Sequence, residues 1–160
     1  MKLTIVLPAT IVAAALGTPA LAGQANAVMQ VRAEVVESCS ASAGHLEFAL
    51  DAADGAKALG QAAVVLSCDG PAAYEIALDA GQNGVRRMVD PASGATLAYE
   101  IYSDAARSLR WGNTRGSDTV AGMADADGKA VLTAYGATLG GGERLPAGTY
   151  ADAVVVTVDF

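Results

Sequence analysis

The stretch GTYADAVVVTVDF, residues 148–160, ends the chain and decides the fold class. From Tyr150 onward the even positions are apolar apart from Asp152, whereas the odd positions become polar toward Asp159. A period of two is typical of a β-strand with one buried face. We therefore expect a strand whose even side chains face a hydrophobic core. Because Phe160 is the last residue of the sequence, we expect no later segment to pair with the far edge of this strand.

The same alternation recurs in short segments that are separated by turns rich in Gly, Pro and Asp. These segments lie within residues 27–39, 46–50, 61–70, 73–81, 90–104 and 118–136. In the last of them Asp125-Ala-Asp-Gly128 separates two β-rich arms, which predicts a hairpin. Helical periodicity is weak throughout. About seven or eight short strands indicate an all-β protein built as an antiparallel β-sandwich.

The N-terminus has the pattern of an export signal. Lys2 precedes an apolar run from Leu3 to about Leu16, and Ala20-Leu-Ala22 supplies small residues at a cleavage site. A second triplet, Ala25-Asn-Ala27, makes cleavage after residue 27 an alternative. The apolar run is too short to span a bilayer, which takes about 20 residues. We expect residues 1–22 to be removed, leaving about 138 residues, enough for one domain.

Charge and cysteine content narrow the possible functions. Loss of residues 1–22 removes Lys2 and no acid, so the formal charge of −7 becomes −8. A nucleic-acid-binding protein needs a basic face, which this acidic chain does not offer. Export places Cys39 and Cys68 in an oxidising compartment, where two thiols normally form a disulfide. With His45 as the lone histidine, the chain has too few ligands for a zinc site.

No motif argues for an enzyme, a metal site or a cofactor. We interpret His45 as a surface residue, because no motif supplies the partners that a catalytic site needs. Aligned on Gly128, a calcium loop would require carboxylates at Met123 and Ala134, so a turn is the better interpretation. The Gly140-Gly-Gly142 loop lacks a phosphate-binding ending. Trp111 is predicted to pack in the core, with a sugar-stacking role as the alternative.

The unpaired last strand leads to a functional hypothesis. Residues 28–35 form a second strand-like segment, with Met29, Val31, Ala33 and Val35 on one side, although Val28 and Val36 leave the choice of side open. An exposed apolar edge promotes aggregation unless another strand covers it. We hypothesise that the domain lacks its final strand and that the N-terminal segment of a neighbouring copy completes it by β-augmentation. The alternative is that this segment pairs within its own chain.

Several stretches carry a resemblance to a known family. They are VMQVRAEVVESCSA, VVLSCDGPAAYEIALDAG, RRM, LAYEIYSD, RWGNT and LPAGTYADAVVVTVDF, and together they span nearly the whole mature chain. In their order and cysteine spacing they resemble the spore coat protein U domain, a family that includes pilins of archaic, Csu-type chaperone–usher systems.

The resemblance implies an incomplete immunoglobulin-like β-sandwich that is completed by donor-strand exchange. It implies a disulfide between Cys39 and Cys68, a donor extension at residues 23–36 and a pilin domain at 37–160. The acceptor groove would be bordered by the closing strand, at Tyr150, Val154, Val156, Val158 and Phe160.

The partners implied by the resemblance are a periplasmic chaperone, an outer-membrane usher and other pilin subunits. The protein would pass through the periplasm to a cell-surface pilus that serves attachment or biofilm formation. The alternatives are a coat protein of spores or cysts, and a secreted ligand-binding module that uses Trp111.

Overall fold

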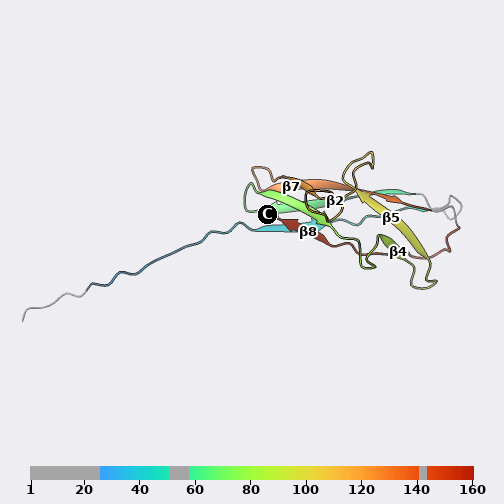
Figure 1. Ribbon diagram of the computed structural model, residues 1–160, viewed down its shortest axis with the longest axis horizontal. Helices are drawn as coiled ribbons and strands as arrows, with labels where there is room; N and C mark the ends of the chain where they lie inside the picture. The colour runs from blue at the N-terminus through green and yellow to red at the C-terminus, as the bar shows by residue number, and fades with distance from the viewer. Residues whose placement is uncertain (1–25, 51–57, 141–143) are drawn as a thin grey trace, which may run out of the picture. The chain divides into compact units, whose positions relative to one another are not determined.

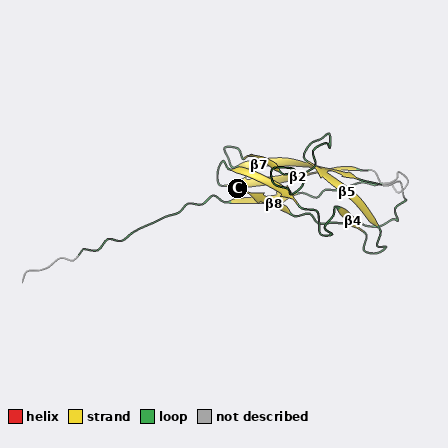
Figure 2. Ribbon diagram, viewed as in Figure 1, coloured by secondary structure: helices red, strands yellow, loops and turns green. Residues whose placement is uncertain are grey.

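Two antiparallel β-sheets make up the domain of this computed structural model, which describes residues 26–50, 58–140 and 144–160 (Figures 1 and 2). The five-stranded sheet has the order β1-β2-β7-β5-β4, and the three-stranded sheet has the order β6-β3-β8. The strands are β1 (Cys39–Ala43), β2 (Leu59–Cys68), β3 (Ala73–Leu78), β4 (Arg87–Val89), β5 (Thr96–Tyr102), β6 (Val120–Met123), β7 (Lys129–Thr138) and β8 (Val156–Asp159). The predicted all-β antiparallel sandwich is therefore confirmed. Within the described ranges, no helix is long and apolar enough to cross a membrane.

Alternating side chains explain why these segments pair around a shared core. On β5, Leu97, Tyr99 and Ile101 are buried while the residues between them are more exposed. The period of two thus gives the strand one inward face, as its sequence predicts. The core combines residues from both sheets, and Trp111 lies fully buried within it. The buried cluster consists of Val64, Ile76, Leu78, Tyr99, Ile101, Trp111 and Ala134.

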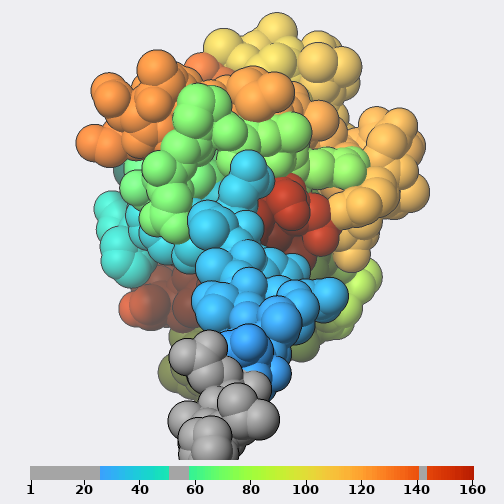
Figure 3. Space-filling view, turned by 90° about the vertical axis from the view of Figure 1, so that its left-hand side faces the viewer, coloured from blue at the N-terminus to red at the C-terminus, as the bar shows by residue number. Residues whose placement is uncertain are grey.

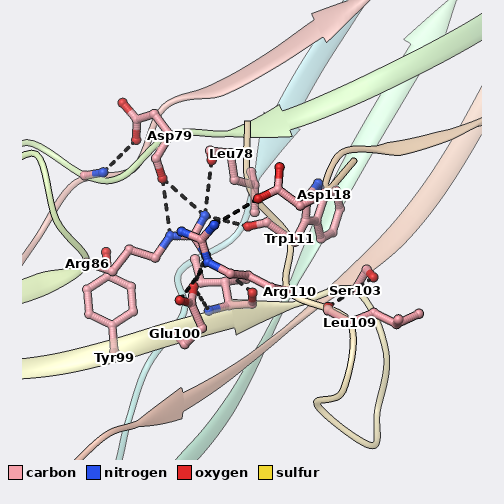
Figure 4. A network of polar contacts seen from close by, with 12 residues as sticks. Leu78, Asp79, Arg86, Tyr99, Glu100, Ser103, Leu109, Arg110, Trp111 and Asp118 are labelled. Carbon is pink, nitrogen blue, oxygen red and sulfur yellow. Dashed lines mark hydrogen bonds and ion pairs between the residues drawn. The ribbon is translucent and has the colours of Figure 1, made fainter. Parts of the chain in front are cut away.

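A buried arginine ties the two sheets together (Figure 4). The Arg86 guanidinium donates to the Glu100 carboxylate at 2.6 Å, and to backbone carbonyls that include Trp111 at 2.6 Å and Leu78 at 3.1 Å. The other Glu100 oxygen accepts from Arg110 Nε at 2.9 Å. Glu100 lies on β5 and Leu78 on β3, so one cation satisfies acceptors from opposite layers.

Three local predictions from the sequence are wrong. The Asp125–Gly128 turn forms, but β6 then pairs with β3 while β7 pairs with β2 and β5, so its arms do not make a hairpin. Residues 46–50 form no strand, although Leu46 and Phe48 still pack against the core. The last strand is shorter than expected, because residues 150–155 lie in no strand. Ala151 forms an isolated bridge to Val89, and the carbonyls of Ala153 and Val155 accept single hydrogen bonds from Gln82 and Asp79. Alternation predicts which side chains face inward but not which backbone groups find a partner.

The chain divides into two units, Met1–Glu34 and Val35–Phe160. The predicted signal peptide at 1–22 lies outside the described residues. Of the first unit the structure describes residues 26–34, which form no strand. An isolated extended segment has no partner for its backbone N–H and C=O groups, so a strand-like sequence alone does not make a strand.

Candidate functional site

An open groove of about 830 Å³ exposes part of the core beside the last strand. One bank runs from Ala43, the last residue of β1, to Leu50. The other bank runs from Gly148 to Val156, the first residue of β8. The floor between them includes Val64, Tyr99 and Ile101. The groove therefore opens directly onto core residues and is bordered by backbone that is mostly not in a sheet.

The last strand has one unpaired edge, and its first residue, Val156, lines the groove. β8 pairs with β3, and no other strand in the described part of the chain pairs with β8. Val154, Val156 and Val158 pack against the core, while Val155 and Thr157 between them are more exposed. Red atoms of the C-terminal segment are visible at the surface of the domain in the space-filling view (Figure 3). An edge of this kind can accept a further strand.

The residues expected to border the groove do not all lie in it. Tyr150, Val154 and Val156 line the groove. Val158 packs against the core beyond the lined region, and Phe160 is 57% exposed. Asp152, the break in the apolar alternation, also lines the groove. Its carboxylate accepts a hydrogen bond of 2.7 Å from the Tyr99 hydroxyl.

This hydrogen bond makes one section of the groove lining partly polar. Tyr99 is buried in the floor, and the ring of Phe48 from the opposite bank lies 6.2 Å from the Tyr99 ring. Burial and the acceptor Asp152 both favour the neutral phenol, so they raise the pKa of Tyr99 above its ordinary value. Phe48, Tyr99 and Asp152 thus form a row of side chains across the groove. We call this row the crossbar.

Glycines let the first bank lie close to the five-stranded sheet. Gly60 and Gly136 face each other on β2 and β7. A Cβ at Gly60 would lie 2.3 Å from the Glu47 carbonyl oxygen, and a Cβ at Gly136 would lie 2.7 Å from the Phe48 ring. The absence of both side chains allows Phe48 to pack inward and to join the crossbar.

The predicted donor residues have exposed apolar side chains. Met29 is 85% exposed, Val31 83% and Val35 96%. Ala33 is also exposed, and none of the four lies in a strand. Val28 and Val36, on the other side of the segment, are also exposed, at 86% and 72%, so exposure alone does not choose the side that is donated.

The disulfide between Cys39 and Cys68 is confirmed. The two residues are directly opposite in the pairing of β1 with β2. The ladder continues one residue further, because the Ser38 carbonyl accepts a hydrogen bond of 3.0 Å from Asp69 N–H. The disulfide therefore fixes the point at which the N-terminal segment joins the domain.

The structure also places the remaining candidate residues from the sequence, Trp111 and His45. Trp111 is 0% exposed and its indole N–H donates to the Ile76 carbonyl at 2.9 Å, so it cannot stack on a sugar. This burial rules out the ligand-binding module that relied on Trp111. His45 is exposed, as predicted, but it lies on the groove bank. Among the described residues, no group of three or more His, Cys, Asp or Glu side chains could hold a metal ion.

Most residues of the first bank and of the groove floor were not predicted as site residues from the sequence. The alternation of Leu46 and Phe48 was a usable signal for inward-facing residues, but not for their position opposite residues 148–156. The single carboxylate in the apolar series, Asp152, was a further signal for a polar contact. Its partner Tyr99 is 53 residues away in the sequence, so only the tertiary structure brings them together.

Comparisons with known proteins match this architecture. A family model for the Spore Coat Protein U domain matches residues 25–157. Protein U of Myxococcus xanthus is 30% identical over 163 residues, which cover 89% of this chain and 89% of that protein.

A solved structure has the same fold. It is a chain in the crystal structure of the CsuC–CsuE chaperone–tip adhesion subunit pre-assembly complex from archaic chaperone–usher Csu pili of Acinetobacter baumannii. The match has a TM-score of 0.59 at 21% identity and covers 79% of the present chain. It covers 40% of the other chain, so the present chain spans about two fifths of its length.

Proposed function

The chain belongs to the Spore Coat Protein U domain family, and from this membership we propose that it is a non-enzymatic pilus subunit of a chaperone–usher system. In this proposal residues 37–160 form the pilin domain and residues 23–36 form the donor segment. The donor segment of one copy fills the groove of the next. The observation that carries the proposal is the groove itself, an 830 Å³ opening onto the core beside the unpaired edge of β8.

The donor segment has the hydrophobicity that the groove needs. If Met29, Val31, Ala33 and Val35 all enter the groove, burial of their side chains contributes on the order of 4–10 kcal/mol as an upper bound. Backbone hydrogen bonds to the edge of β8 would add to this free energy. Such a contact joins two different surfaces of the subunit, so it is head-to-tail and produces a filament instead of a closed dimer.

The start of the domain supports filling by another copy. Ser38 and Cys39 are held against Asp69 and Cys68 by a backbone hydrogen bond and by the disulfide. A segment that leads directly into β1 must reverse its direction to lie beside the bank that continues from β1. The residues available for that reversal, Val35 to Glu37, include no Gly, Pro, Asn or Asp, which are the usual turn residues. The donor segment of a second molecule meets no such restriction.

The proposed route to the cell surface follows from the family and the leader sequence. Residues 1–22 direct export, a periplasmic chaperone covers the groove during transit, and an outer-membrane usher assembles the subunits. The similarity in fold to a chain of a chaperone–tip adhesion subunit complex supports a chaperone as a partner. The assembled pilus serves surface attachment or biofilm formation.

Deletion of residues 24–35 tests the proposal. The truncated protein, produced with its chaperone and usher, should be recovered as a folded chaperone complex but should form no polymers. The full-length protein should give a ladder of multimers on a denaturing gel without boiling, and one band after boiling, because dissociation of donor-strand polymers is kinetically blocked. Normal ladders from the truncated protein would refute the proposal.

A second candidate is a structural coat protein of spores or cysts. The 30% identity to Protein U of Myxococcus xanthus and the family's description favour this function. The two functions differ in gene context and timing. Chaperone and usher genes beside this gene support the pilus, whereas expression confined to developing spores or cysts without those genes supports the coat.

A further inference from the structure

The side chains that line the groove change in character along its length, which restricts the strand that can fill it. At the crossbar, Tyr99 is buried but its hydroxyl is held by Asp152 at the groove wall, and Phe48 packs beside its ring. The rings of Phe48 and Tyr99 therefore fill the floor of this section, and the Asp152 carboxylate makes it partly polar. This section leaves room for a small side chain above its floor.

The next section of the groove is apolar. Leu46, two residues from Phe48 of the crossbar, packs against the core there. The first bank continues alongside β2, because Gly44 N–H donates to the Ala63 carbonyl, and Leu46 contacts the Cβ positions of Gly60 and Gly136. Gly136 pairs with Ile101, so Leu46 lies near the level of Ile101. This section accepts a larger apolar side chain.

The donor segment carries a matching pair of side chains. Ala33 is the smallest of its predicted inward-facing residues, and Val31 is the neighbouring one on the same side. Ala33 fits above the crossbar and Val31 fits beside Leu46. Because side chains alternate along a strand, Arg32 then points away from the groove floor.

The bank beside Arg32 carries the opposite charge. Glu47 lies between the inward-facing residues Leu46 and Phe48, is exposed, and takes part in none of the ion pairs found in the described part of the chain. Arg32 is the only cationic side chain in residues 24–38.

The charges also distinguish the two possible directions of the donor strand. With Ala33 above the crossbar, a donor that runs antiparallel to residues 148–156 places Arg32 beside Glu47. A donor that runs in the opposite direction places Glu34 beside Glu47, which brings two negative charges together. Like charges on neighbouring strands are destabilising and opposite charges are stabilising.

We propose that Arg32 of one copy forms an ion pair with Glu47 of the next, and that this pair, with Ala33 above the crossbar, fixes the direction and register of the donor strand. This inference rests on the proposed function, because it requires a second copy of the chain in the groove. The groove thereby selects a strand with a small residue next to a cationic one, and selects against a donor whose acidic residue meets Glu47.

Charge reversal in the full chain tests the ion pair. Polymers of the wild type, Arg32→Glu, Glu47→Lys and the double variant are produced with chaperone and usher, and the rate at which the ladder dissociates is measured at one elevated temperature. Loss of an exposed pair together with like-charge repulsion should make each single variant dissociate about three to ten times faster. The double variant should dissociate within about twofold of the wild-type rate. Glu37→Lys, outside the proposed contact, should dissociate at the wild-type rate.

A size change at Ala33 tests the register independently of charge. Ala33→Leu should abolish the ladder, because the larger side chain clashes with the crossbar, whereas Val31→Leu should leave it. Both changes lie outside the folded domain and leave its stability unchanged. Unaltered dissociation in both charge variants, failure of the double variant to recover, or a normal ladder from Ala33→Leu would overturn the register. A wild type that forms no ladder would overturn the proposed function instead.

Discussion

Arg86 offers the sharpest test of how the sandwich is held together. Its side chain is only 3% exposed, and its guanidinium donates to Glu100 and to the carbonyls of Leu78, Asp79, Ile101 and Trp111. Replacement of Arg86 by Met keeps a long unbranched side chain and removes every hydrogen-bond donor of the guanidinium. The change therefore isolates the polar network from the packing of the side-chain stem.

The expected cost follows from the acceptors that remain buried. The Ile101 carbonyl still accepts from Trp111 N–H, and Glu100 still accepts from Arg110. The carboxylate of Glu100 nevertheless loses its buried partner, and breaking a buried ion pair on one side costs about 3–5 kcal/mol. Each buried carbonyl left without a donor costs about 1–3 kcal/mol in comparable cases, which is consistent with that range.

Urea unfolding provides the measurement, and the chain supplies its own probe. Trp111 is the only tryptophan and is fully buried, so its fluorescence reports the loss of the core. Arg86→Met should lower the free energy of unfolding of the mature protein by about 3–5 kcal/mol.

Arg115 is the matched control for this measurement. It also forms ion pairs with two carboxylates, Glu75 and Asp159, but its side chain is 65% exposed. Arg115→Met should therefore cost at most about 1 kcal/mol. Equal losses for the two variants would refute the conclusion that the buried network joins the layers.

Three further outcomes are expected of the mature protein. Reduction of the Cys39–Cys68 disulfide, whose partners are 29 residues apart, should lower the unfolding free energy by about 3.5 kcal/mol, and unchanged urea midpoints with and without reductant would contradict this estimate. Gly136→Ala should push Phe48 toward the groove and cost about 1–3 kcal/mol, whereas Gly70→Ala, whose Cβ meets no atom within 4 Å, should unfold as the wild type does. Stability should also fall in acid. Hydrogen bonds from the Thr119 hydroxyl to Glu75, from the Ser93 hydroxyl to Asp90 and from Leu109 N–H to Asp104 hold the pKa values of these carboxylates below the ordinary 4.5 for Glu and 3.8 for Asp. The stabilisation is then complete above those ordinary values and is lost as the pH falls through the lower pKa values of the folded state, so unfolding free energies that stay constant from pH 6 to pH 3 would contradict it.

Local alternation was a reliable guide to burial. It predicted the inward faces of β2, β3 and β5, and it predicted that Val154, Val156 and Val158 face the core. Even where no strand formed, as at Leu46 and Phe48, the apolar residues packed inward. Burial depends on the residue's own hydrophobicity and on a period of two, both of which are properties of a short segment.

Pairing was less predictable. The turn at Asp125–Gly128 was recognisable from its residues, yet β6 and β7 separate into different sheets. The isolated Asp152 was visible in the sequence, whereas its hydrogen bond to Tyr99 depends on how two distant segments meet. These outcomes reflect competition among backbone partners and contacts over long sequence separations, which no single segment encodes.

By itself the sequence determined the all-β class, the antiparallel sandwich, the disulfide and the apolar face of the last strand. Each of these depends on residue type, short-range periodicity or the pairing of the only two cysteines. The tertiary structure alone decided that residues 43–50 and 148–156 face each other across an open groove, with Tyr99 and Asp152 in its crossbar. That arrangement depends on which strands share a sheet and where their edges remain unpaired, and the free energies that settle those choices come from the whole core at once.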